Sequence, residues 1–108
     1  MHSRDFSRAD RLSDLIRAEI SLMLRDEIKD PRLKGMTIIN AEMSEDLKKA
    51  YVYFSSLNSF SAIELVDVLK GLSKAKGFMR NSLGKRLNIK RVPELVFKQD
   101  ILTPLKDS

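Results

Sequence analysis

The 108-residue chain contains no cysteine and only one histidine, and these two shortages exclude much of the chemistry that proteins perform. Without cysteine there is no disulfide, no thiolate metal ligand and no cysteine nucleophile, and the composition fits a reducing compartment. His2 stands next to the start of the chain, where an imidazole is more often incidental than a ligand or a general base. The Gly-rich phosphate-binding motifs and the nucleophile-elbow motif are missing too. We therefore expect no enzyme activity, no metal and no cofactor.

Long hydrophobic runs are also missing. No apolar stretch approaches the roughly 18 residues that a membrane-spanning helix needs. The N-terminal sequence MHSRDFSRADR is charged where a signal peptide has an apolar region. The length suits one domain, and 43% apolar with 32% charged residues is ordinary for a globular protein. We expect a cytoplasmic protein without a membrane partner, with one domain over residues 1–100 and a flexible C-terminal tail over residues 101–108.

The spacing of the apolar residues predicts a helix in the first part of the chain. Apolar side chains recur three or four residues apart after Ser7, which forms a capping-box pattern with Asp10. Pro31 disfavours helical geometry at Asp30, so the helix should end shortly before it. The predicted buried stripe contains Leu12, Ile16, Ile20 and Met23.

Two strands are predicted next, in residues 36–44 and 49–56, where apolar and polar residues alternate. The connection between them, SEDLKK, is short and polar, which favours an antiparallel hairpin. Strict alternation in the first strand places four side chains on one face, namely Thr37, Ile39, Ala41 and Met43.

A second helix is predicted from Ser59 onward, and it contains a conflict. In a straight helix Lys76 would lie within about 20° of Leu65 and Leu83, so that its ammonium group would enter the apolar stripe. A kinked or split helix at Ala75-Lys76-Gly77 would remove the conflict, because Gly77 tolerates unusual backbone geometry. Residues 93–100 then read as a third strand.

These elements predict an α+β fold in the order helix, strand, strand, kinked helix, strand. A long helical crossover usually joins parallel strands, so the third strand should pair with the second in a mixed sheet of order 1-2-3. Both helices should cover the face that carries Ile39, Val52, Phe54 and Phe97. Tyr51 and Tyr53 would lie on the other face.

One segment carries the positive charge of the whole chain. The formal net charge is +5, yet residues 70–91 contain eight Lys or Arg and no Asp or Glu. Ordinary solvated helix faces mix both signs, because opposite charges four residues apart stabilise the helix. An acid-free amphipathic segment therefore favours binding to nucleic acid over a purely solvated face, an anionic membrane or an acidic protein partner. The predicted RNA-binding residues are Lys70, Lys74, Lys76, Arg80, Lys85, Arg86, Lys90 and Arg91. Secondary RNA contacts are predicted for Arg4, Arg8, Arg11, Tyr51 and Tyr53.

Four motifs, in order along nearly the whole chain, resemble the bacterial ribosome-binding factor A family. They are R-x-x-R-L-x-x-x-I-x-x-x-I ending in D-P-R-L (8–33), M-S-x-D-L-x-x-A-x-V-Y-F-S (43–55), A-x-G-F-M-R (75–80) and V-P-E-L-x-F-x-x-D (92–100). The resemblance implies a single type II KH-like domain. A typical KH domain clamps the nucleic-acid backbone with a G-x-x-G loop, which this chain lacks. In the family an Ala-x-Gly kink takes that place, and Ala75 and Gly77 match it.

The resemblance also implies a function. Members of the family are non-catalytic assembly factors that bind the free small (30S) ribosomal subunit, contact 16S rRNA and assist its late maturation and processing, notably in the cold. An assembly GTPase is a further candidate partner, and we expect the protein to be a monomer. Two alternatives stay open, namely a protein-interaction module whose basic helix docks on an acidic partner, and a general single-stranded RNA binder.

Overall fold

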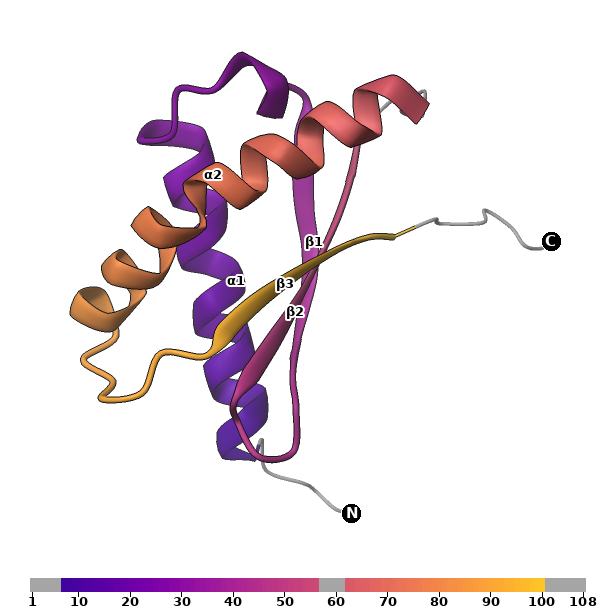
Figure 1. The fold of residues 1–108 in the computed structure, drawn as a ribbon. Helices are drawn as coiled ribbons and strands as arrows, with labels where there is room; N and C mark the ends of the chain where they lie inside the picture. The colour runs from indigo at the N-terminus through magenta and orange to yellow at the C-terminus, as the bar shows by residue number, and fades with distance from the viewer. Residues whose placement is uncertain (1–6, 57–61, 101–108) are drawn as a thin grey trace, which may run out of the picture.

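Two helices cover one face of a three-stranded sheet in the computed structural model, which describes residues 7–56 and 62–100 (Figure 1). The elements in chain order are α1 (Arg8–Asp26), the 3-10 turn η1 (Pro31–Leu33), β1 (Met36–Met43), β2 (Lys49–Ser56), α2 (Ala62–Arg86) and β3 (Glu94–Gln99). The predicted α+β order of elements is confirmed. Residues 1–6, 57–61 and 101–108 lie outside the described part, and with them Arg4 and the predicted tail.

Helix α1 begins and ends as local sequence rules predict. The Ser7 hydroxyl accepts a hydrogen bond from the Asp10 backbone N–H at 3.1 Å, and the Asp10 carboxylate accepts one from the Ser7 backbone N–H at 3.4 Å. This reciprocal pair is the predicted capping box. The helix ends at Asp26, and Pro31 opens the 3-10 turn that leads into β1.

The sheet has the predicted order and pairing. Strand β1 pairs with β2 in the antiparallel sense, β2 pairs with β3 in the parallel sense, and β2 lies in the centre. The prediction for the inward face of β1 was partly wrong, because the register shifts between Ile38 and Asn40. Ile39 is thus the extra residue of a β-bulge, and Ile38 and Ala41 face the core, each 7% exposed.

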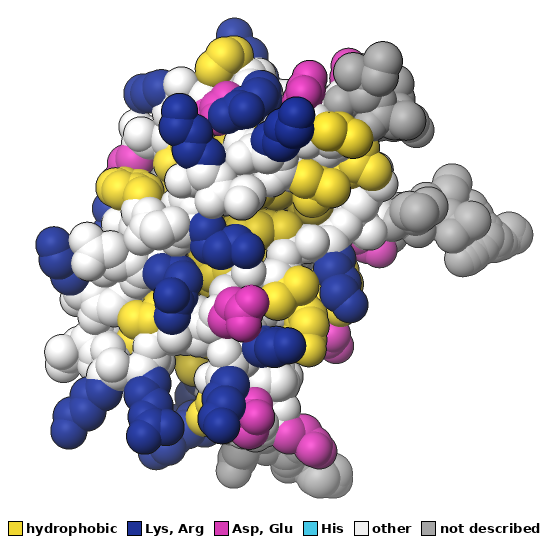
Figure 2. Space-filling view, viewed as in Figure 1, with side chains coloured by type: hydrophobic (Ala, Val, Ile, Leu, Met, Phe, Trp, Pro, Cys, Tyr) yellow, Lys and Arg dark blue, Asp and Glu magenta, His cyan; other side chains and the backbone are white. Residues whose placement is uncertain are grey.

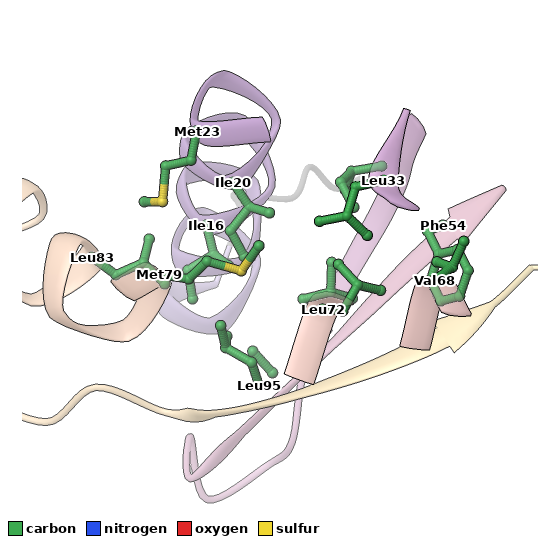
Figure 3. Close-up of a cluster of buried hydrophobic side chains, with 13 residues drawn as sticks. Ile16, Ile20, Met23, Leu33, Phe54, Val68, Leu72, Met79, Leu83 and Leu95 are labelled. Carbon is green, nitrogen blue, oxygen red and sulfur yellow. The ribbon is translucent and has the colours of Figure 1, made fainter. Parts of the chain in front are cut away.

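The core lies between the helices and the sheet and unites all the elements (Figure 3). Phe54 from the central strand and Leu95 from β3 are completely buried. Helix α1 contributes Ile16, Ile20 and Met23, all completely buried. Helix α2 contributes Val68, Leu72, Met79 and Leu83. Since a fully buried side chain of this size contributes roughly 1.5–3 kcal/mol, this core holds both helices firmly on the sheet.

Helix α2 is continuous from Ala62 to Arg86, so the split form of the second helix was wrong. Its axis changes direction partway along, as a kinked helix would (Figure 1). Lys76 is partly exposed at the edge of a shallow groove between α2 and β3, so its ammonium group stays out of the core. Gly77 is exposed, and a Cβ atom placed on it would meet no heavy atom within 4 Å. That the kink depends on Ala75 and Gly77 stays a prediction.

Candidate nucleic-acid interface

The candidate interface consists of the outer face of α2 and the loop that follows it. Dark blue Lys and Arg side chains gather over the C-terminal end of α2 and this loop, at the lower left of Figure 2. Helix α2 has its acidic side chains only near its start, at Glu64 and Asp67. The positive surface is therefore a property of the helix from Lys70 onward.

Six of the eight predicted RNA-binding side chains make no hydrogen bond or ion pair with any residue in ranges 7–56 and 62–100. These six, which we call the free cations, are Lys70, Lys74, Lys76, Lys85, Lys90 and Arg91. Five of them are exposed, and Lys76 is partly exposed. Their charges lack a counter-charge within hydrogen-bonding distance, so a polyanion could approach them without first breaking a contact in the protein.

Arg80 is engaged inside the protein. Its Nε donates to the Pro93 carbonyl oxygen at 3.1 Å, and its Nη2 donates to the Val92 carbonyl oxygen at 2.9 Å. These bonds hold the last residues before β3 against the C-terminal half of α2. Two of the five N–H donors of the guanidinium are thus used for structure. Binding of RNA by Arg80 stays a prediction.

Arg86 is engaged as well, with one carboxylate of α1 and with that of Glu27, the residue that follows α1. Its Nη1 lies 3.5 Å from Glu19 Oε1, and its Nη2 donates to Glu27 Oε1. The hydrogen bond to Glu27 is the main reason why the pKa of Arg86 is raised above its ordinary value. Arg86 therefore joins the end of α2 to α1, and its charge is largely balanced by the protein itself.

The fold adds cations that were predicted only as secondary contacts or were not predicted. Arg8 and Arg11, at the start of α1, line a groove together with Arg91 from the α2–β3 loop. Lys48, from the β1–β2 turn, lies at the same groove and was not predicted. The floor is apolar, with Leu12, Leu15, Leu47, Ile89 and Val92 among its lining residues. Nothing in the local sequence pattern signals this groove, because its walls come from three separate segments.

The two tyrosines lie on the sheet face that the helices leave uncovered, and both have partners there. The Lys98 ammonium nitrogen lies 4.9 Å from the centre of the Tyr51 ring, which is a cation–π contact. The Tyr53 hydroxyl donates to Glu42 Oε1 at 3.1 Å. Burial first, and then this bond to Glu42, raise the pKa of Tyr53. Base stacking by Tyr51 and Tyr53 would have to compete with these contacts, and it stays a prediction.

A further set of residues that were not predicted as site residues, Asp30, Arg32 and Gly71, lies where η1 packs against α2. The Arg32 Nη2 lies 2.7 Å from Asp30 Oδ2, and this pairing is the main reason why the pKa of Asp30 falls to about 2. The positive charge of Lys74, on α2, also lowers the pKa of Asp30. An added Cβ atom on Gly71 would lie 3.0 Å from Leu33 Cδ2, so the missing side chain lets η1 approach α2 closely.

Across the described ranges, no group of three or more His, Asp and Glu side chains is arranged to hold a metal ion. No helix in the same part of the chain is both long and apolar enough to cross a membrane.

The fold and this surface define a small α+β domain whose second helix carries no acidic side chain from Lys70 onward, and comparison with known proteins places it in a family. The family model described as ribosome-binding factor A matches residues 8–103. A ribosome-binding factor A from Syntrophus aciditrophicus is 42% identical over 95 residues, which cover 88% of this chain and 76% of the relative. The chain belongs to the ribosome-binding factor A family.

Solved structures agree on the fold. The crystal structure of ribosome-binding factor A from Thermus thermophilus superposes with a TM-score of 0.73 at 22% identity, over 86% of this chain and 97% of that one. A homology model of the Thermus thermophilus factor, fitted into the cryo-electron microscopy map of its complex with 30S, has a TM-score of 0.59 at 26% identity. It covers 83% of this chain and 97% of that one.

Proposed function

We propose that this protein is a non-catalytic ribosome assembly factor that binds the free small (30S) subunit through 16S rRNA and assists late maturation and processing of that RNA. The observation that carries the proposal is the set of six free cations on α2 and its following loop. Membership of the ribosome-binding factor A family and the 30S complex of the Thermus thermophilus factor support it. In this proposal the protein acts as a monomer.

The affinity would come mainly from the phosphates. Each Lys or Arg that neutralises an RNA phosphate releases condensed counterions, and this release is the driving force. Contacts to the backbone position the protein but do not read base sequence, so the shape of the folded rRNA has to provide much of the specificity. The factor can favour one rRNA conformation only to the extent that it binds that conformation more tightly than the others.

The test is the salt dependence of binding to purified small subunits. If five of the free cations meet duplex phosphates, the logarithm of the association constant should fall with the logarithm of salt concentration with a slope of about −4.5. Replacing both Lys74 and Lys85 with glutamine should make the slope shallower by about 1.8. The control is Lys98→Gln, since Lys98 is also exposed but lies over the Tyr51 ring, on the sheet face that the helices leave uncovered. A slope near zero for the unmodified protein would refute the electrostatic mechanism.

The groove lined by Arg8, Arg11 and Arg91 favours a second candidate function. The groove is lined by apolar side chains, four basic side chains and the one carboxylate of Asp46. This excess of positive charge would suit a protein segment that combines apolar and acidic side chains, and an assembly GTPase is one candidate for the partner. Co-sedimentation with small subunits before and after ribonuclease treatment separates the two functions. Binding that survives removal of the RNA would favour the protein partner, and binding that is lost would favour rRNA.

A further inference from the structure

Phe78 is an exposed aromatic side chain among the cations of α2. It is 46% exposed, and it is the one aromatic residue among the exposed large hydrophobic residues of the described ranges. Lys74 precedes it by four residues and Lys85 follows it by seven, so both lie within about 40° of Phe78 around the helix axis. A phenyl ring is thus exposed on the same face as two free cations.

A groove lies beside Phe78, between α2 and the segment that links α1 to β1. It has a volume of about 430 Å³, within the usual range of roughly 300–1,000 Å³ for small-ligand clefts. Ala75 and Phe78 line it from α2, and Ile28 and Pro31 line it from the linking segment. The close approach of η1 to Gly71 fixes the distance between the two walls.

The charges around this groove leave it positive. Its two carboxylates already have partners, because Glu27 is paired with Arg86 and Asp30 with Arg32. Lys29 and Lys74 also line the groove, and neither makes a hydrogen bond or an ion pair with a described residue. The groove therefore combines an aromatic and aliphatic wall with two unpaired ammonium groups, which suits a nucleotide: the face of its base can lie on the wall, and its phosphate can meet the ammonium groups.

We propose that Phe78 stacks on an unpaired nucleobase of the bound RNA, with Lys74 and Lys29 on the phosphates that flank it. The inference rests on the proposed function and adds a base-binding subsite to it. Aromatic side chains bind single-stranded nucleic acid in this way because every base has a π-face. The stack would direct the protein to a place where the rRNA is single-stranded or has a base turned out, which phosphate contacts alone cannot do.

The sheet tyrosines are weaker candidates for this role. Tyr51 already has the Lys98 ammonium over its ring, and the Tyr53 hydroxyl is bonded to the Glu42 carboxylate. A base on either ring would have to displace a cation or approach a negative charge. Phe78 has no such competitor within residues 7–56 and 62–100, and its nearest charged neighbours on the helix are lysines.

The chain contains no tryptophan, so Phe78→Trp introduces a single indole whose fluorescence reports on this position. The probes are an RNA hairpin with an unpaired loop and a fully paired RNA duplex of the same length. Stacking predicts that the hairpin quenches the indole fluorescence strongly and the duplex does so weakly. Equal quenching by both RNAs, or none by either, would overturn the proposal.

Affinity measurements complete the test. Phe78→Leu should weaken binding of the hairpin roughly 5- to 150-fold, the range for losing one base–aromatic stack, whereas Phe78→Tyr should bind as the unmodified protein does. Leu22→Ala, at another exposed apolar side chain, is the control and should change nothing. Circular dichroism verifies that each variant is folded.

The salt dependence separates this inference from the proposed function. Phe78→Leu should keep the slope of the unmodified protein, since its phosphate contacts are intact. A normal slope with unchanged affinity in Phe78→Leu would overturn the stacking alone. A slope near zero in the unmodified protein would overturn the proposed function.

Discussion

Helix α2 is continuous and yet bends, and replacing Gly77 with alanine tests whether the bend requires glycine. Gly77 lies in the interior of α2 on its exposed side, and an added Cβ atom would meet no heavy atom within 4 Å. In an exposed helix interior, glycine is less favourable than alanine by about 0.5–1 kcal/mol, because it loses more backbone entropy on folding. We therefore expect Gly77→Ala to stabilise the protein by about that amount and to raise Tm by roughly 2–8 °C.

The matched control is Gly35→Ala. A Cβ atom on Gly35 would also meet nothing within 4 Å, so the two glycines differ mainly in backbone conformation. Gly35 has a φ of +83°, in the left-handed region where a side chain is strained. We expect Gly35→Ala to destabilise the protein by about 1–2 kcal/mol. Thermal unfolding followed by circular dichroism measures both changes.

The result that would refute the reasoning is a loss of stability in Gly77→Ala. It would mean that the bend of α2 requires a backbone conformation that only glycine adopts easily. Binding to small subunits gives a second and independent answer. If Gly77→Ala is more stable but binds less tightly, the flexibility of α2 at Gly77 contributes to function and not to folding.

Two further outcomes are expected. Phe54 is completely buried in the central strand, so Phe54→Ala should lower the free energy of unfolding by about 3–5 kcal/mol in urea titrations, and a loss below about 1 kcal/mol would contradict the core described above. The pKa of Asp30 is lowered from 3.8 to about 2, so the stability it contributes is present above pH 4 and is lost as the pH falls from about 4 through 2. Urea titrations between pH 5 and pH 2 should therefore show a shallower loss of stability in Asp30→Asn than in the unmodified protein, and parallel curves would show that the Arg32 pairing does not contribute.

Local sequence determined the elements of the fold and their order. The capping box of Ser7 and Asp10, the end of the first helix before Pro31 and the hairpin all depend on residues close together in the chain. The parallel pairing of β3 with β2 followed from the length of the helical crossover. The concentration of basic residues between 70 and 91 was also visible at once, because charge is a property of the residues themselves.

Packing decided which face of β1 is buried. Ile38 and Ile39 are adjacent and equally apolar, so alternation alone cannot show that a bulge turns Ile38 inward. A β-bulge depends on how the partner strand and the helices fit against the sheet, and no local signal in the sequence records that fit.

Tertiary structure also decided which basic groups are free. Arg86 is joined to carboxylates 59 and 67 residues away in the chain, and Arg80 bonds to carbonyl groups 12 and 13 residues away. The groove beside Phe78 exists because η1 approaches α2 at Gly71. Helical and strand periods relate only residues two to four positions apart. The sequence alone could therefore locate the positive charge, but it could not show which basic groups are paired with distant residues. Only the packing of distant segments determined which of those charges, and which aromatic ring, remain available to a partner.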